Sequence, residues 1–342
     1  MRFGLFGSAQ TTTGEGAMGP GQGFRDYVEF TIEAEALGYH SAFLVEHHFT
    51  GWNQVSAPLN LLTWVAARTT TLRVGTAVMV LPWHNPVLLA EQAATLDLLS
   101  GGRLDLGIGK GYRYNEFNGF RIPMEEAEPR FDEALDVIIK AWTATGRFSH
   151  QGRYWQFENI AVEPPPAQQP HPPLWTAAGS PASIRRVAER RCNLMLDQFA
   201  TPQIIGERIA LFRKELEARG RPFDPLTVAV ARDVYVAKDR ADKLAALERN
   251  AKFRQRTVEV SRVPGRLGGS HVLAYDHTPV RSESVALYGT PDEIMEKLEA
   301  LRAVGVSYIL AIIGGGSRES LRRFARDVAP AFTGGERATV RS

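Results

Sequence analysis

Several features are scarce or absent in this sequence of 342 residues, and each absence narrows the class of protein. Cys192 is the only cysteine, so an intrachain disulfide and a zinc site built on thiolates are both excluded. No segment approaches the roughly 18 consecutive apolar residues of a transmembrane helix. The N-terminal stretch MRFGLFGSAQ lacks the longer apolar run of a signal peptide, so we expect a cytoplasmic protein without a membrane partner.

A strong net charge is absent as well. The 40 basic and 38 acidic residues leave a formal charge of +2, which gives no electrostatic reason to expect a nucleic-acid partner. No Gly-x-Gly-x-x-Gly motif follows the first apolar run, which disfavours a doubly wound dinucleotide-binding fold.

The sequence does contain a regular alternation of short apolar runs and longer helical segments, which is typical of parallel βα units. We expect strands at Arg2–Phe6, Ser41–Val45, Leu72–Val80, Arg103–Gly107, Leu174–Ala177, Asn193–Leu196, Thr227–Val236 and Tyr308–Ile313. Helices are expected at Phe24–Leu37, Pro58–Arg68, Pro86–Leu99, Glu128–Thr143, Pro181–Arg190, Thr201–Arg219, Pro291–Ala303 and Ser317–Ala329. Eight such units predict an α/β fold, a closed (β/α)₈ TIM barrel.

One barrel domain is expected over residues 1–335, followed by a disordered tail at 336–342. Two stretches interrupt its rhythm. Residues 148–173 are rich in proline and aromatic residues and are interpreted as a small excursion with the character of a hairpin. Residues 253–287 are too long for an ordinary connection, and we interpret them as an active-site lid in preference to a solvated loop.

The richest polar motif, Glu46-His47-His48, follows the second expected strand. In such barrels the active site lies where the strands end. Consecutive side chains there point in opposite directions, so the three cannot all face one ligand and a metal triad is not expected. Either one histidine faces the barrel axis and exchanges protons, or a carboxylate holds a histidine and ties the strand to its loop. The spacing alone leaves both interpretations open.

Two further strand ends carry groups suited to an anion. Lys110 stands between two glycines, which lets backbone N–H groups approach a phosphate. Gly179, Ser180 and Ser183 supply amides and hydroxyls at a helix N-terminus. Together they suggest a phosphorylated cofactor, with Arg130 as a third contributor, although spacing alone favours a surface ion pair for that arginine.

Residues 44–50, LVEHHFT, resemble the segment that ends the second strand in the bacterial luciferase-like family of flavin-dependent monooxygenases. Three more stretches match in the same order: GTAVMVLP with NPV over residues 75–87, LDLLSGGR running into GIGKG over residues 96–111, and GTP at residues 289–291. The resemblance extends from Arg2 to about Phe332.

This resemblance implies an enzyme that takes reduced FMN as a co-substrate, reacts it with O₂ and oxygenates a small apolar organic molecule. A separate flavin reductase would supply the FMNH₂, and the enzyme would be a homodimer, with Glu91 matching a carboxylate near the subunit interface. His47 matches the active-site histidine, which assists proton transfer. Ala77 and Val78 match a non-proline cis peptide beneath the flavin ring.

The resemblance also assigns Lys110, Arg130, Ser180 and Ser183 to the phosphate-binding positions. Gly109 stands where luciferase has a reactive thiol, and we expect its loss to enlarge the pocket near the flavin. Two alternatives remain: hydride transfer with deazaflavin F420 in the same superfamily, and a flavin-binding protein without turnover. Aldehydes, alkanes, ketones and similar substrates are not ranked by the sequence.

Overall fold

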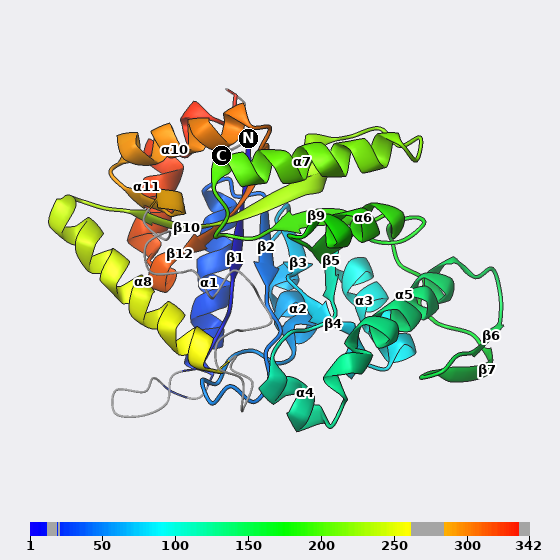
Figure 1. The fold of residues 1–342 in the computed structure, drawn as a ribbon. Coiled ribbons are helices and arrows are strands. Elements are labelled where there is room, and N and C mark those ends of the chain that lie inside the picture. Colours follow the sequence, from blue (N-terminus) through cyan, green and yellow to red (C-terminus); the bar gives the residue numbers. More distant parts are fainter. Residues whose placement is uncertain (12–18, 20, 261–283, 335–342) are drawn as a thin grey trace.

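The structure is a computed structural model that describes residues 1–11, 19, 21–260 and 284–334, and it forms a parallel β-barrel surrounded by helices (Figure 1). The barrel strands are β1 (Arg2–Gly7), β2 (Ser41–Leu44), β3 (Arg73–Thr76), β5 (Leu104–Gly109), β8 (Leu174–Ala177), β9 (Asn193–Leu196), β10 (Val228–Val236) and β12 (Tyr308–Ile313). They pair in the order β10–β12–β1–β2–β3–β5–β8–β9, and β9 pairs with β10 to close the ring. The predicted eight-stranded barrel is confirmed.

Helices cover the outside of this ring. They are α1 (Gln22–Ala36), α2 (Pro58–Arg68), α3 (Pro86–Leu99), α4 (Tyr114–Phe120), α5 (Ala127–Thr143), α6 (Pro181–Glu189), α7 (Pro202–Glu217), α8 (Arg240–Val260), α10 (Pro291–Ala303) and α11 (Arg318–Asp327). Several begin with proline after a side-chain cap, as at Asn85, Ser180, Thr201 and Thr290. Proline lacks only an N–H that has no partner in the first turn, and the cap satisfies another, so the sequence fixes these helix starts.

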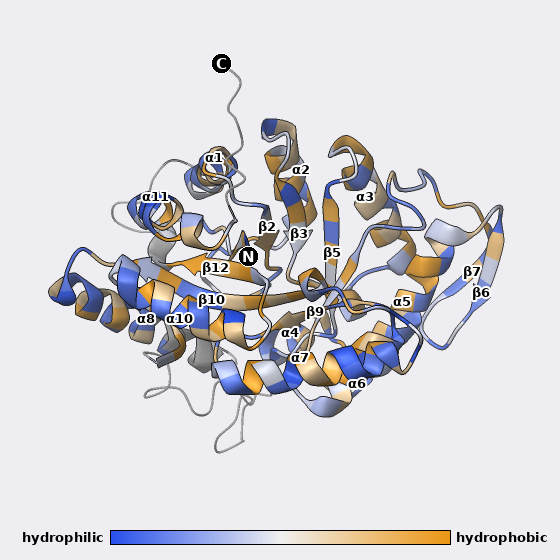
Figure 2. Cartoon of the chain, turned by 90° about the horizontal axis from the view of Figure 1, so that it is seen from above, coloured by the Kyte–Doolittle hydropathy of each residue, from blue (hydrophilic) through white to orange (hydrophobic). Residues whose placement is uncertain are grey.

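Alternation along the strands separates the inside of the barrel from the outside. Phe43 packs with Trp175 and Tyr308 in a cluster formed by side chains of several barrel strands, whereas its neighbours Ala42 and Leu44 pack in the larger core. Because successive side chains point to opposite faces, one strand contributes to both layers. Figure 2 shows the apolar strands ringed by helices.

The prediction of one strand over Leu72–Val80 is wrong in one respect, because the structure has two strands there. The peptide between Ala77 and Val78 is cis and separates β3 from β4 (Met79–Val80). β3 pairs with both β2 and β5, whereas β4 pairs only with β5. The expected cis peptide is therefore present, and it ends the first ladder.

The two predicted interruptions have different outcomes. Residues 148–173 contain the antiparallel hairpin of β6 (Phe148–Gln151) and β7 (Gln156–Ile160), which lies at the periphery of the barrel (Figure 1). Residues 253–260 of the predicted lid belong to α8. Its last residue, Leu287, begins β11 (Leu287–Gly289), which pairs with β10. Residues 261–283 of the lid and the predicted tail at 336–342 lie outside the described residues.

Helix α4, which the sequence pattern did not reveal, follows β5 on the face of the barrel where the strands end (Figure 1). It spans only Tyr114–Phe120, which is too short to show a clear helical periodicity. Its position matters because it carries side chains that contact the loop after β2.

Candidate active site

The carboxylate of Glu46 forms a buried clamp at the end of β2. It accepts hydrogen bonds from His84 Nε2 at 2.7 Å, from His48 Nε2 at 3.1 Å and from the backbone N–H of Val80 at 2.7 Å. Burial alone raises the pKa of Glu46, but the hydrogen bonds from His48 and His84 outweigh it, so the pKa lies below its usual value. The clamp joins the loop after β2 to the chain around β4, and it gives His48 and His84 a positioning role.

His47 is held by a different carboxylate. Its Nδ1 lies 3.0 Å from Glu116 Oε1, and the same oxygen accepts the backbone N–H of His48 at 2.9 Å. An ionised carboxylate can only accept hydrogen bonds, so Nδ1 donates and Nε2 keeps its lone pair. No hydrogen bond to Nε2 is found among the described residues. His47 is therefore oriented by Glu116 while its second nitrogen is free to exchange a proton.

The electrostatic surroundings keep His47 neutral over a wider pH range than usual. Burial lowers the pKa of His47 below 6.5, and the positive charge of Arg113 lowers it further, while the hydrogen bond to Glu116 opposes both. At ordinary pH, a neutral imidazole can take up a proton on its unprotonated nitrogen, so it acts as a base rather than as an acid. The structural interpretation, a histidine held by a carboxylate, therefore describes His48, and proton exchange at His47 stays a prediction.

Gly109 and the cis peptide lie side by side. A Cβ placed on Gly109 would stand 2.4 Å from Val78 Cγ2, so the Val78 side chain fills the space that a side chain at position 109 would need. The expectation that glycine enlarges the pocket is therefore wrong here, because Val78 occupies the room. Ala77 and Val78 stay predicted flavin contacts.

A cluster of cations gathers near the ends of β5 and β8, which are neighbouring strands. Lys110, Arg186 and Arg190 all pair with Glu128, and Arg190 also pairs with Asp132. The three cations outweigh the two carboxylates. Burial alone raises the pKa of Glu128, but the hydrogen bond and charge of Lys110 lower it overall.

The first turn of α6 adds hydroxyls to this region. Ser180 Oγ accepts the backbone N–H of Ser183, and Ser183 Oγ accepts the backbone N–H of Ser180, which together form a capping box preceded by Gly179. Ser180 is exposed and Ser183 is half-buried. An excess of positive charge and a helix N-terminus are the features that bind phosphate groups.

Arg130 is not joined to this cluster by any contact within the described part of the chain. Its guanidinium pairs with Glu126 at 2.8 Å and lies 4.4 Å from the centre of the Tyr154 ring. This agrees with the surface ion pair that spacing alone favoured, and a phosphate contact of Arg130 stays a prediction.

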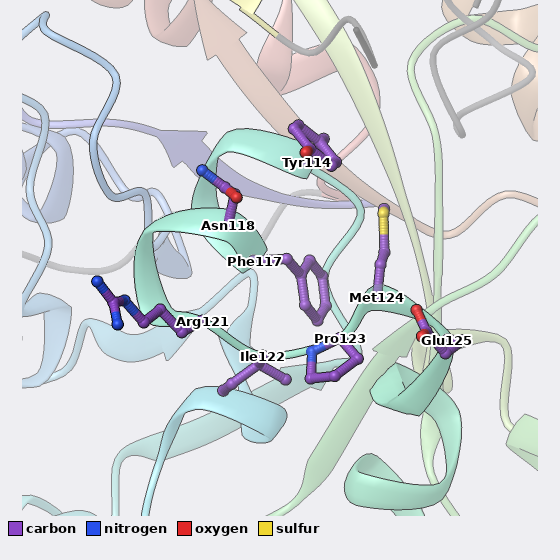
Figure 3. Close-up of a pocket in the computed structure, with 8 residues that line it drawn as sticks. All are labelled: Tyr114, Phe117, Asn118, Arg121, Ile122, Pro123, Met124 and Glu125. Carbon is purple, nitrogen blue, oxygen red and sulfur yellow. The ribbon is translucent and has the colours of Figure 1, made fainter. Parts of the chain in front are cut away.

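A pocket of about 280 Å³ is lined by residues of α4 and of the segment that follows it (Figure 3). Phe117 and Met124 line it, with Arg121 and Glu125 on opposite sides, and neither His47 nor Lys110 takes part. Glu116 and Phe117 are adjacent on α4, so this helix contributes both to the pocket and to the contact with His47. The polar groups converge at His47 rather than at this pocket, and a catalytic role of His47 stays a prediction.

Sequence reasoning missed four residues of the site: Arg113, Glu116, Arg186 and Arg190. Arg113 and Glu116 lie next to or on the unpredicted α4, whereas Arg186 lies in α6 and Arg190 directly follows it. Within the described ranges, no group of three His, Cys, Asp or Glu side chains is arranged to hold a metal ion. No described helix is long and apolar enough to cross a membrane.

A closed parallel barrel with an oriented histidine and a cationic cluster at its strand ends defines a class of cofactor-dependent (β/α)₈ enzymes, and the comparisons with known proteins define it further. The model of the luciferase-like monooxygenase family matches residues 1–308. The chain belongs to this family.

Similar proteins include two kinds of enzyme. The oxygenase component of the flavin-dependent trigonelline monooxygenase of Acinetobacter baylyi is 28% identical, with 97% of this chain and 96% of the relative covered. The crystal structure of the monooxygenase RslO1 from Streptomyces bottropensis superposes with a TM-score of 0.81 at 26% identity and covers 97% of this chain and 100% of that one. An F420-dependent secondary alcohol dehydrogenase shares the fold, with a TM-score of 0.78 at 18% identity and coverage of 97% and 98%. Proteins similar to this chain in sequence or fold thus include a flavin-dependent enzyme and an F420-dependent enzyme.

Proposed function

We propose that this protein is the oxygenase component of a two-component FMN-dependent monooxygenase. It takes one substrate molecule, one O₂ and one FMNH₂, and it releases the oxygenated substrate, water and FMN. A separate reductase supplies the FMNH₂. The observation that carries the proposal is the oriented His47–Glu116 pair in a chain that is similar to a flavin-dependent oxygenase component over 97% of its length.

The residues at the strand ends fit FMN. Lys110, Arg186 and Arg190 carry more positive charge than Glu128 and Asp132 neutralise, which suits a phosphate dianion. The N–H groups at the start of α6 add donors for the same group. Gly109 lets Val78 pack closely at the expected position of the flavin ring.

When bound, reduced FMN supplies the two electrons that activate O₂. The chain provides the rest: Glu116 holds the Nδ1 proton of His47, and Nε2 accepts or returns a proton beside the reacting atoms. The buried Glu46 clamp keeps the loop after β2 in place. Because a proton delivered too early wastes O₂ as hydrogen peroxide, a mostly neutral His47 favours coupling of O₂ use to substrate oxygenation.

Binding and reoxidation of the flavin test this proposal. We expect the protein to bind FMNH₂ in preference to reduced F420, and the oxidised FMN spectrum to return more slowly after mixing with O₂ than it does for free FMNH₂. Lys110→Met should weaken FMN binding, whereas His47→Ala should leave FMN binding nearly unchanged and raise the hydrogen peroxide released per O₂. Tight binding of F420 with no effect on FMNH₂ reoxidation would instead support the hydride-transfer alternative.

A homodimer is part of the proposal. Leu88, Leu98 and Leu99 of α3 and Trp64 of the adjacent α2 are large apolar side chains left exposed, and Leu99 is 65% exposed. Such a patch on one face of two neighbouring helices is suited to a second copy of the chain. Glu91 lies on the same helix as these leucines.

A further inference from the structure

Arg113 is the most unusual charged residue near the candidate active site. It directly precedes α4, lies three residues after Lys110 in the sequence, and is only 3% exposed. Its Nε and Nη1 atoms are buried without a hydrogen-bond partner. No ion pair of Arg113 is found in the part of the chain that the structure describes. The chain therefore buries a positive charge that it does not neutralise.

The other deeply buried arginine shows what a structural arginine looks like in this fold. Arg232 is 1% exposed, but it donates hydrogen bonds to the backbone oxygens of Asp197, Ala231 and Ala200. A buried charge costs several kcal/mol unless it is paired and hydrogen-bonded. Arg232 meets that requirement through carbonyl groups, whereas Arg113 lacks any such partner and is poised for an anion from outside the chain.

The neighbours of Arg113 indicate which anion. The cationic cluster of Lys110, Arg186 and Arg190 is the phosphate site of the proposed function, and no contact joins Arg113 to it among the described residues. Arg113 instead lies close enough to His47 for its charge to act on that imidazole, and its guanidinium lies 5.6 Å from the centre of the Tyr112 ring. A planar guanidinium beside an aromatic ring suits a planar carboxylate on a small organic molecule.

We propose that Arg113 binds a carboxylate of the organic substrate and so anchors it beside His47. This inference rests on the proposed function, because it names the substrate class of the same site: small organic acids, in ionised form, with an apolar part to be oxygenated. Glu116 does not compete for Arg113, because no ion pair joins them and its Oε1 already accepts from His47 and His48.

Carboxylate binding can be measured without turnover. We would titrate the full-length, FMN-loaded protein with benzoate by calorimetry, with benzamide as the uncharged probe of the same shape. Benzoate is expected to bind, and benzamide to bind at least about tenfold more weakly, because only the carboxylate compensates the guanidinium. Equal affinity for the two probes would overturn the proposal.

Three variants locate the binding. Arg113→Met should lower the benzoate affinity at least about tenfold, while Arg121→Met, which changes an exposed arginine at the other end of α4, should leave it unchanged. Lys110→Met separates the two anion sites. Benzoate binding that survives Arg113→Met and is lost in Lys110→Met would show a phosphate-site ligand and would contradict the assignment.

A stability measurement and FMN binding complete the test. Arg113→Met is expected to keep or raise Tm, because it removes an unpaired buried charge. A Tm several degrees lower would show that the arginine has a structural role, and the proposal would fail. FMN affinity should not change in Arg113→Met. Benzoate binding without any slowing of FMNH₂ reoxidation would refute the oxygenase function while leaving the carboxylate site intact.

Discussion

His47 and His48 are adjacent in the sequence, but different carboxylates hold their imidazoles. His48 shares the buried Glu46 with His84, so three side chains from two loops are locked together. His47 turns to Glu116 on α4 and keeps Nε2 without a hydrogen bond among the described residues. The division follows from strand geometry, because neighbouring side chains point to opposite faces.

Glu116→Gln tests the control of His47 at the residue scale. The hydrogen bond and charge of Glu116 raise the pKa of His47 against burial and Arg113. Removing the charge should therefore lower the pKa of His47 further, and the acid limb of the pH–rate profile should move to lower pH. Titration of the His47 ring resonances by NMR measures this, with Glu125→Gln, an exposed carboxylate nearby, as the control. A pKa that rises or stays constant would disprove the pairing.

The same pKa shift gives a stability prediction with a definite sign. The unfolded chain has a His47 pKa near 6.5, and the folded value lies lower because of burial, so the unfolded state takes up the proton first. The stabilisation is fully present above about pH 6.5 and is lost as the pH falls toward the folded pKa. Urea unfolding at several pH values measures this contribution. Between pH 7 and 5, the free energy of unfolding should fall less in His47→Gln than in the parent protein. An equal fall in the two proteins would contradict the lowered pKa of His47 in the folded state.

Gly109→Ala probes the packing against the cis peptide. Its Cβ would approach Val78 Cγ2 to 2.4 Å, so we expect a loss of about 1–3 kcal/mol in the free energy of unfolding. Val78→Ala removes the clashing methyl groups, so the double variant should recover part of the loss. Urea denaturation measures both, and additive effects in the double variant would show that the two residues do not meet.

The sequence predicted individual residues unevenly, for a physical reason. Lys110 and Ser180 stand next to glycine or proline residues that mark element ends, and His47 follows an apolar strand, so their positions at strand ends could be inferred. Glu116 lies in a helix of about two turns, and Arg113 directly precedes it; so short a helix shows no clear periodicity. The contact of Glu116 with His47, which is far away in the sequence, depends on the closed barrel.

At the scale of elements, most bounds agree with the sequence pattern because caps define them. Strands β8, β9 and β12 and helices α2, α3 and α10 have the predicted ends. The errors lie where tertiary contacts decide: the third strand breaks at Ala77–Val78, and α8 extends into the interval assigned to a lid. Neither a cis peptide nor a polar helix leaves a periodic apolar signal.

The N-terminus of α6 allows a matched test of its expected phosphate role. Ser180→Ala should cost about 1 kcal/mol of stability through the lost cap. It should also weaken FMN binding several-fold, because a hydroxyl is lost from the anion site. Ser317→Ala removes an equivalent cap at α11, away from the strand ends that carry Lys110, and should destabilise similarly while leaving FMN affinity unchanged. Equal FMN affinity in both variants would remove Ser180 from the site.

In the whole molecule, one face of the barrel carries exposed apolar side chains that a single copy of the chain does not explain. Helix α3 places leucines on both its buried and its exposed sides, because Leu89 and Leu96 lie in the core while Leu88 and Leu99 face out. A surface helix usually confines apolar residues to one stripe. The two-sided pattern suggests that this helix is buried from both sides in the working enzyme.

Light scattering of the protein eluting from a sizing column tests the proposed dimer. We expect a dimer for the parent protein and monomers for Leu98→Glu combined with Leu99→Glu, because two charges on this face resist burial against a second copy. Leu244→Glu changes an equally exposed leucine on α8 and should stay dimeric. If the double variant is monomeric and still binds FMN, each barrel holds a complete site. If it remains dimeric, the copies associate through another face, and the exposed leucines of α3 need a different partner.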